Sequence, residues 1–494
     1  MFNIADSHPL LHMVHVYMSI AILFTNYFLA QYDKFILSYF QASVLKSLSL
    51  TGTQYALLSG YSTGIVYALL ALPVAFVADF TSARVWTLSI ASLWWSLCVI
   101  FQGLAKDFAD IYCARLGMGI GQAAVEALSV SLISDLVGWR NVFIGESVLY
   151  VGVYVGEAIS GQIATSFSKT GTSWQVAMRA IGITGIVVSV LLRLVLREPT
   201  RASPIREQEH EEREFAESVE NGPDRKESSL VLSSLTTTLS FLIRLRSFWP
   251  LVLSAGLRQL AGNVFGYYMP GYLSSVYDTV PDLLSRYGII VGTVGSASVI
   301  AGGLLTSLLW HRTKLTPIYL TTIGGFLSSI FVLLMIFSKD VAAGDEQVGV
   351  KILYATMSAA YLTAETWLGC MSAMIALLLL PEYKTFGLAI WSSIQVLIYS
   401  SGPEIIGLAV RNLDPGSAEY TKIIKICLAV IIPVGYWGCG LGMLLSIPLV
   451  RKDLKDQTLL VPASPSRKIA IGALVSVLVV LVIILFVLSL VYSV

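Results

Sequence analysis

The sequence predicts an all-α polytopic membrane protein with two sets of six membrane-spanning helices and a thirteenth helix at the C-terminal end. Hydrophobic residues make up 55% of the 494 residues and charged residues 13%, whereas soluble domains carry about 25% charged residues. The apolar residues gather in successive segments of about 20 residues or more, the length needed to cross a bilayer. One highly charged stretch separates the first six segments from the last six. These three observations together exclude an ordinary soluble domain.

The first six spans are predicted from apolar segments in the N-terminal part of the chain, and we assign residues 1–196 to this bundle. Each segment has the length of a transmembrane helix, and the breaks between segments are short. The predicted spans are residues 14–41, 53–79, 85–105, 108–137, 142–168 and 173–196.

Residues 197–247 form a polar connector with EQEHEEREFAESVENGPDRKESS at its centre, a composition typical of a disordered or loosely helical linker. Lys and Arg are concentrated in the loops that lie on the connector's side of the membrane, so we expect the N-terminus and the connector to be cytoplasmic. The second bundle is predicted over residues 248–450, with spans at 249–277, 285–310, 316–338, 352–380, 385–410 and 423–450.

The C-terminal region follows a cytoplasmic linker at residues 451–467. Residues 468–494 form the predicted thirteenth span, because no charge interrupts the sequence from Ile469 to Val494. This segment is rich in β-branched residues and poor in polar groups. We therefore interpret it as an anchor or a lipid-facing accessory helix, and a helix that binds a partner is the alternative.

The fourth predicted span carries the polar residues Arg115, Gln122 and Glu126 within the stretch ARLGMGIGQAAVEALSVSLISD. Spacings of seven and four residues place all three on one helical face. An ionisable side chain inside a bilayer costs about 2.5–3.5 kcal/mol on insertion scales, so it normally faces the protein interior or a water-filled path. We expect this face to line a substrate pathway; a buried salt-bridge helix that positions its neighbours is the alternative.

The first span adds an acid and a cation, Asp33 and Lys34. If Asp33 faces Arg115, its proton affinity depends on how close water and the partner charges are, and a conformational change alters both. Asp33 and Glu126 are therefore the candidate proton-coupling residues, while Lys34, Arg115 and Gln122 are candidate substrate-binding residues. A purely structural ion pair at Asp33 is the alternative.

The second half offers one cation and one acid within otherwise apolar spans, Arg258 and Glu365, which we predict to pair and to contact substrate. Tyr268 belongs to an aromatic group that suits a ligand with a polar head and a lipid tail. Simple packing of these aromatic rings is the alternative interpretation of Tyr268.

Motifs of other chemistries are missing from the sequence. The five cysteines have no CxxC or Cys/His spacing, and there is no P-loop, HExxH or nucleophile elbow. We therefore expect neither an enzyme nor an ATP-driven pump, and we expect no metal site, no cofactor and no nucleic-acid partner.

The loop between the second and third spans, AFVADFTSAR, resembles the G-x-x-x-D-R-x-x-R loop of the major facilitator superfamily, whose arrangement of six spans, a connector and six spans also matches. Ala75 replaces the loop's glycine and Phe80 its first basic residue. The resemblance implies a major facilitator fold, with two bundles that rock about a central site. It also makes Asp79 and Arg84 candidate gating residues, because a carboxylate and a facing cation form a latch that breaks on rocking.

Further motifs resemble the spinster-like branch of this superfamily. NYFLAQYDKF is similar to the branch's N-x-x-D-R, with Asp33 and Lys34 as the matching pair, and ARLGMGIGQA is similar to its R-x-G-x-G-I-G-E-A. Gln122 stands where the branch has glutamate, so Glu126, one turn later, is the candidate replacement for that charge. The resemblance implies that the aspartate and cation govern coupling and headgroup contact, and that lysophospholipids or sphingoid phosphates are substrates.

Taken together, we expect a secondary active transporter that moves an amphiphilic lipid by proton-linked alternating access. The alternatives are a symporter or uniporter of a small organic anion, and a channel or transport-dead receptor on the same scaffold. We expect a monomer in the lipid bilayer. The charged connector and a short acidic dileucine pattern at Asp456 to Leu460 favour an endolysosomal membrane over the plasma membrane.

Overall fold

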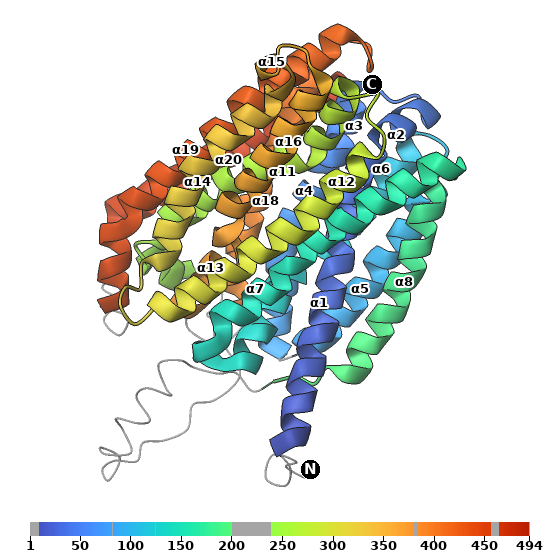
Figure 1. Cartoon of the computed structure of the whole chain (residues 1–494). Helices are drawn as coiled ribbons and strands as arrows, with labels where there is room; N and C mark the ends of the chain where they lie inside the picture. Colours follow the sequence, from blue (N-terminus) through green and yellow to red (C-terminus); the bar gives the residue numbers. More distant parts are fainter. Residues whose placement is uncertain are drawn as a thin grey trace, which may run out of the picture.

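The computed structural model describes residues 9–81, 83–123, 125–199, 239–379, 384–455 and 464–493, and their regular elements are helices (Figure 1). Eleven helical segments within these residues are long and apolar enough to cross a membrane. The long helices run side by side, with the start of α1 at one end of the molecule and α2 and α15 at the other (Figure 1). The all-α polytopic fold predicted from the sequence is confirmed.

Helices of the first half follow the predicted spans to within a few residues. They are α1 (Pro9–Tyr39), α2 (Gln41–Ser47), α3 (Gly52–Ser59), α4 (Tyr61–Thr81), α5 (Arg84–Gln102), α6 (Phe108–Gln122), α7 (Val125–Thr170) and α8 (Trp174–Val195). Thr51 begins the second span with a capping box, because its hydroxyl accepts from Gln54 N at 3.2 Å and Gln54 Oε1 accepts from Thr51 N at 2.9 Å. Helix α7 contains all of the fifth predicted span and the end of the fourth.

Helices of the second half include two irregular turns. The elements are α11 (Phe248–Val276), α12 (Leu283–Ile290), the π-helical turn η2 (Val291–Gly295), α13 (Ser296–Leu309), α14 (Thr316–Ile336), α15 (Ser338–Val341), α16 (Glu346–Ala364), the 3₁₀ turn η3 (Glu365–Trp367), α17 (Leu368–Leu378), α18 (Lys384–Ala409) and α19 (Ala418–Lys455). Such breaks inside long helices often mark functional positions, and η3 begins at Glu365.

The two halves meet along two seams. On one side α7 packs against α12, α13 and α17, and on the other α18 packs against α3 and α4. The first seam is tightly packed at Ser147. A Cβ atom would lie 2.3 Å from the Ser147 hydroxyl oxygen if it were added to Gly303, and 2.5 Å from it if it were added to Gly369. These glycines let three helices approach closely at one point.

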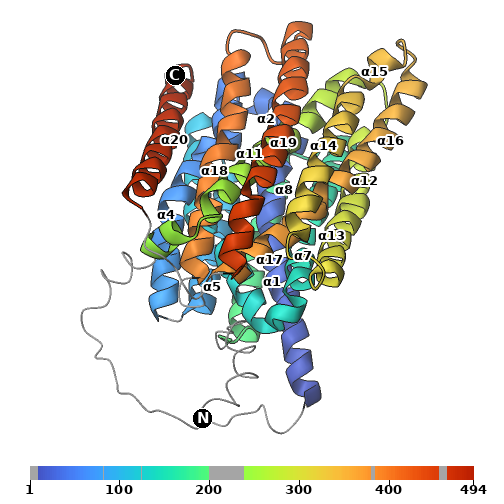
Figure 2. The same cartoon turned by 90° about the vertical axis from the view of Figure 1, so that its left-hand side faces the viewer.

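The C-terminal helix α20 (Pro465–Val491) lies at the edge of the bundle (Figure 2), where it packs against α18 and α3. Its end contacts both halves. Thr53 Oγ1 and Gln54 Nε2 donate to the carbonyls of Tyr492 and Ser493 at 3.1 and 3.0 Å, and the Arg411 guanidinium lies 4.5 Å from the Tyr492 ring centroid. Helix α20 has the length and hydropathy of a membrane span. Its role as a thirteenth span stays a prediction.

Candidate functional site

A central cavity lies between the two halves and has two lobes. The N-lobe, about 110 Å³, is lined by residues that include Arg115, Gln122 and Glu126. The C-lobe, about 80 Å³, is lined by residues that include Arg258 and Glu365. Both lobes share the lining residues Lys34, Phe35, Val153, Gln259 and Leu368. The structure thus brings six of the predicted site residues to one cavity.

Arg115 is the buried cation of the N-lobe, with 1% of its surface exposed. Its Nη1 donates to Gln102 Oε1 and its Nη2 to Tyr267 OH, each at 3.4 Å, whereas its Nε has no partner. Among the described residues, no carboxylate lies within salt-bridge distance of this guanidinium. Because a buried cation normally has an anionic partner, Arg115 is well suited to receive an anion from the substrate.

Lys34 lies where the two lobes meet. Its Nζ is 4.4 Å from the ring centroid of Tyr399 and 5.2 Å from that of Phe35. Cation–π contacts of this kind hold an ammonium group in place without neutralising its charge. Within the described part of the chain Lys34 also has no salt-bridge partner, although Glu126 and Glu157 line the lobes to which it belongs. The cavity therefore contains two cations that form no direct salt bridge with a described carboxylate.

The predicted facing pair of Asp33 and Arg115 is not in contact in this state. Asp33 is 3% exposed; its Oδ2 accepts from Trp95 Nε1 at 3.0 Å, and its Oδ1 has no partner. It lies beside the cavity wall and lines neither lobe. Its predicted role in proton coupling stays a prediction.

Gln122 and Glu126 both line the N-lobe, as their common helical face predicts. Gln122 Nε2 donates to the Ala30 carbonyl at 3.3 Å. Glu126 Oε1 accepts from Tyr150 OH at 2.8 Å, and the same hydroxyl lies 3.2 Å from Ser372 Oγ of α17. The carboxylate of the fourth span is therefore connected to a helix of the other half.

The C-lobe contains the pair predicted from the sequence. Arg258 Nη2 lies 3.4 Å from Glu365 Oε1 and donates to the Ala364 carbonyl at 2.7 Å, and its guanidinium stacks on Tyr436 at 4.0 Å. Glu365 Oε2 accepts from Tyr154 OH at 2.6 Å. Since Tyr154 belongs to α7, this hydrogen bond also crosses between the halves.

Among the tyrosines, sequence reasoning singled out a residue away from the cavity and missed others beside it. Tyr268 is 1% exposed, donates to the Pro403 carbonyl at 3.3 Å and lines neither lobe. Its neighbour Tyr267 lines the N-lobe and donates to the Lys34 carbonyl at 3.0 Å. Tyr150 and Tyr154 were missed, although their spacing of one helical turn with hydroxyls in an apolar span is a detectable signal.

On the connector side a cluster of charges joins the halves. Asp135 accepts from Arg84 Nη1 at 2.7 Å and from Lys384 Nζ at 2.8 Å, and Arg84 Nε donates to Glu198 Oε1 at 2.7 Å. We call these four residues the connector-side lock. Lys384 belongs to the second half and the other three to the first. The Asp79 side chain lies outside the described residues, so the predicted latch between Asp79 and Arg84 remains a prediction.

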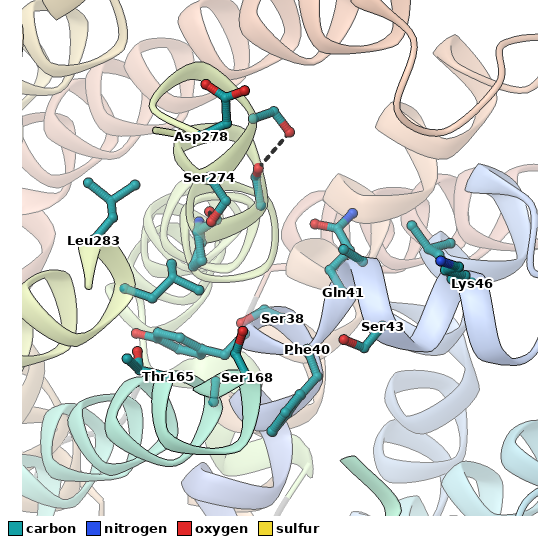
Figure 3. A pocket seen from close by; sticks show the side chains of 18 of the residues that line it. Ser38, Phe40, Gln41, Ser43, Lys46, Thr165, Ser168, Ser274, Asp278 and Leu283 are labelled. Atoms are coloured by element: carbon teal, nitrogen blue, oxygen red, sulfur yellow. Dashed lines mark hydrogen bonds between the residues drawn. The ribbon is translucent and has the colours of Figure 1, made fainter. Parts of the chain in front are cut away.

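The opposite end of the molecule is hollowed into a vestibule of about 1040 Å³ (Figure 3). Polar side chains from α1, α2, α7 and α11 surround it, among them Ser38, Gln41, Thr165 and Ser274 (Figure 3). The vestibule shares no lining residue with the central lobes. The protein is thus held closed by the lock on the connector side and hollowed on the opposite side, with the two small lobes at the centre.

Comparisons with known proteins agree with this architecture. The model of the Major Facilitator Superfamily matches residues 23–403. The chain is 24% identical over 318 residues to a probable L-galactonate transporter of Escherichia coli, covering 61% of this chain and 65% of that protein. It is 23% identical over 264 residues to a sphingosine-1-phosphate transporter of Danio rerio, covering 50% and 48%. The chain therefore matches less than two thirds of the length of each relative.

The fold also resembles a solved structure, a bacterial homologue of the human lysosomal transporter Spinster in an inward-facing, unoccupied conformation. The TM-score is 0.62 at 18% identity, and the likeness covers 93% of this chain and all of that one. At this identity the likeness establishes the fold alone. The match over residues 23–403 shows that the chain belongs to the Major Facilitator Superfamily, a family of membrane transporters and not of enzymes.

Proposed function

We propose that the protein is a secondary active transporter that moves an amphiphilic lipid with an anionic headgroup, of the lysophospholipid or sphingoid phosphate type, by proton-linked alternating access. One observation carries the proposal: a small cavity between the two halves holds Lys34 and Arg115 without salt bridges to any described carboxylate. Two such cations create a site that an anionic group completes.

The headgroup would bind between Lys34 and Arg115, and the tail would lie along the aromatic wall formed by Phe35, Tyr267 and Tyr399. Both lobes are far smaller than the roughly 300–1,000 Å³ of drug-sized ligand pockets. Substrate entry therefore requires the halves to separate, which is what alternating access supplies. The similarity to a sphingosine-1-phosphate transporter supports this substrate class.

A small organic anion such as a sugar acid is the second candidate. The lobes of about 110 and 80 Å³ suit a compact polar substrate better than a lipid tail in this state. The similarity to a probable L-galactonate transporter favours the same candidate. Both substrates would use the same two cations, so the tail is the property that discriminates between them.

Proton linkage is assigned to Asp33 and Glu126. Asp33 is buried with one unbonded oxygen, and Glu126 lines the N-lobe, as does Lys34. Rocking would change how close water and the neighbouring cations are to each carboxyl, and it would thereby link protonation to the open side. Arg258 and Glu365 would provide a second polar contact on the opposite wall.

The test is uptake into proteoliposomes of a labelled lysophospholipid and, separately, of labelled galactonate, each with and without an imposed pH gradient. We expect gradient-driven lipid uptake in the wild type and its loss in Asp33→Asn, while the exposed-site control Asp110→Asn behaves as the wild type. Uptake of galactonate alone would establish the second candidate. Flux that does not saturate would indicate a channel, and binding without flux of either compound would indicate a receptor; both results would overturn the proposal.

We further propose that the protein acts as a monomer in an endolysosomal membrane. The acidic dileucine pattern that supports this location lies outside the described residues. Microscopy of the tagged full chain against lysosomal and plasma-membrane markers tests the location, and single-molecule photobleaching tests the stoichiometry. Plasma-membrane staining or two bleaching steps for each particle would contradict the respective statement.

A further inference from the structure

Glu146 on α7 is a buried acid to which the proposed mechanism gives no role. Glu146 is 0% exposed, and neither of its carboxylate oxygens has a hydrogen-bond partner. An ionised carboxylate without a partner in such surroundings loses several kcal/mol of solvation, so a group in this position is normally neutral. The adjacent Ser147 is enclosed by Gly303 and Gly369, which keeps this part of the seam tightly packed.

The position of Glu146 along the membrane lies between the central cavity and the connector-side lock. It is five residues from Asn141, where the span begins on the connector side, and Glu126 is eleven residues from Val137, where the preceding span ends. At 1.5 Å per residue these separations correspond to depths of about 7 and about 16 Å. Glu146 therefore lies at a depth between that of Glu126 and the connector side, where a proton moving between the two would have to pass.

Titratable groups face Glu146 from each half. Glu126 and Tyr150 belong to α7, Cys370 to α17 and Lys384 to α18. Lys384 forms a salt bridge with Asp135 while the lock is closed, so Asp135, and not Glu146, balances the charge of Lys384. Breaking the bond between Lys384 and Asp135 would therefore free a cation that faces Glu146.

Two hydroxyl groups join Glu146 to the cavity. Tyr150 OH donates to Glu126 Oε1 at 2.8 Å and lies 3.2 Å from Ser372 Oγ. Ser372 in turn faces Glu146, although neither Glu146 oxygen is hydrogen-bonded in this state. Ser372 is therefore the link between Tyr150 and Glu146 in the sequence Glu126, Tyr150, Ser372, Glu146.

We propose that Glu146 is a proton relay residue that exchanges protons between Glu126 and the connector side. The Ser372 hydroxyl first turns to donate to the Tyr150 oxygen, while the Tyr150 proton stays directed at Glu126 Oε1. Glu146 then releases its proton to the Ser372 oxygen, the Ser372 hydroxyl proton passes to the Tyr150 oxygen, and the Tyr150 proton passes to Glu126. Glu146 becomes a carboxylate and Glu126 a carboxylic acid, while both hydroxyls are regenerated. Opening of the lock then lets Glu146 take a new proton from water. The inference rests on the proposed proton linkage and adds its route.

Glu146→Gln is the decisive variant, because the amide has the shape of the protonated acid and leaves no buried charge. In proteoliposomes we expect this variant to retain substrate counterflow, which needs no net proton movement, and to lose pH-gradient-driven accumulation by at least tenfold. Tyr150→Phe, which breaks the relay elsewhere, should show the same separation. The exposed-site control Glu419→Gln should keep both activities.

Infrared difference spectroscopy gives a readout that a merely structural role would not produce. The wild type should show the carbonyl stretching band of a buried carboxylic acid, and Glu146→Gln should lack it. Wild-type accumulation by Glu146→Gln, or an unchanged carboxylic acid band, would overturn the relay while leaving the proposed function intact. If the wild type itself shows no gradient-driven uptake, the proposed proton linkage fails first and the relay fails with it.

Discussion

Removing Lys384 from the connector-side lock should make the protein open more readily on that side. Lys384 Nζ bonds Asp135 Oδ1 at 2.8 Å across the two halves, while Arg84 holds the other carboxylate oxygen from within the first half. Lys384→Gln therefore removes the ionic contact between the halves but leaves Asp135 paired. A hydrogen bond to a charged group contributes about 1.5–3 kcal/mol, and 1.4 kcal/mol changes an equilibrium constant about tenfold. The open population should rise by about tenfold to a hundredfold.

Maleimide labelling of Thr385→Cys in a background without the five native cysteines measures this opening. Thr385 is fully buried, and its hydroxyl lies 3.0 Å from Ser131 Oγ of the other half, so it becomes accessible only when the halves separate. The matched control is Lys425→Gln, because Lys425 pairs with Asp340 inside one half. An unchanged labelling rate in Lys384→Gln, or an equal increase in the control, would refute the role of the lock.

Three further predictions follow from contacts around the cavity and the seams. Arg115→Gln should raise the KM for uptake by more than tenfold, because a charge-assisted contact to the substrate is lost; an unchanged KM would contradict the headgroup site. Tyr154→Phe removes a hydrogen bond between the halves and should destabilise the protein by about 1.5–3 kcal/mol, measured by thermal unfolding against Tyr420→Phe, whose hydroxyl has no partner. Deletion of residues 464–494 should speed labelling of Ser59→Cys by a membrane-soluble maleimide, since α20 contacts both halves and Ser59, at the end of α3, is 5% exposed and lines the N-lobe; an unchanged rate would show that α20 does not restrain the seam between α3 and α18.

The positions of the spans could be predicted from the sequence because the length of an apolar segment is a local property. The common face of Arg115, Gln122 and Glu126 was also predictable, since helical spacing alone places them together. All three residues line one lobe in the structure, and their roles in binding and coupling stay predictions.

Contacts between distant segments could not be predicted in this way. Asp135 and Lys384 are far apart in the sequence, and only the packing of the two halves brings them together. Tyr267 and Tyr268 differ by one position, and the phase of α11 decides which one reaches the cavity. Because α11 is buried on most sides, its sequence carries little information about that phase.

The burial of Glu146 is a third feature that could not be predicted from the sequence. Glu146 lies only five residues from Asn141, where its span begins, yet it is 0% exposed in a helix that packs against α12, α13 and α17. Burial by tertiary packing is invisible to a reading of span boundaries. The same packing gives the acid its isolation and its proposed role.

The most direct test of proton-linked transport is the pH inside proteoliposomes when substrate is added outside without an imposed gradient. A lumenal pH dye should report a substrate-dependent change in the wild type and none in Asp33→Asn. Substrate uptake without any change in lumenal pH, or the same change in the variant, would contradict the account.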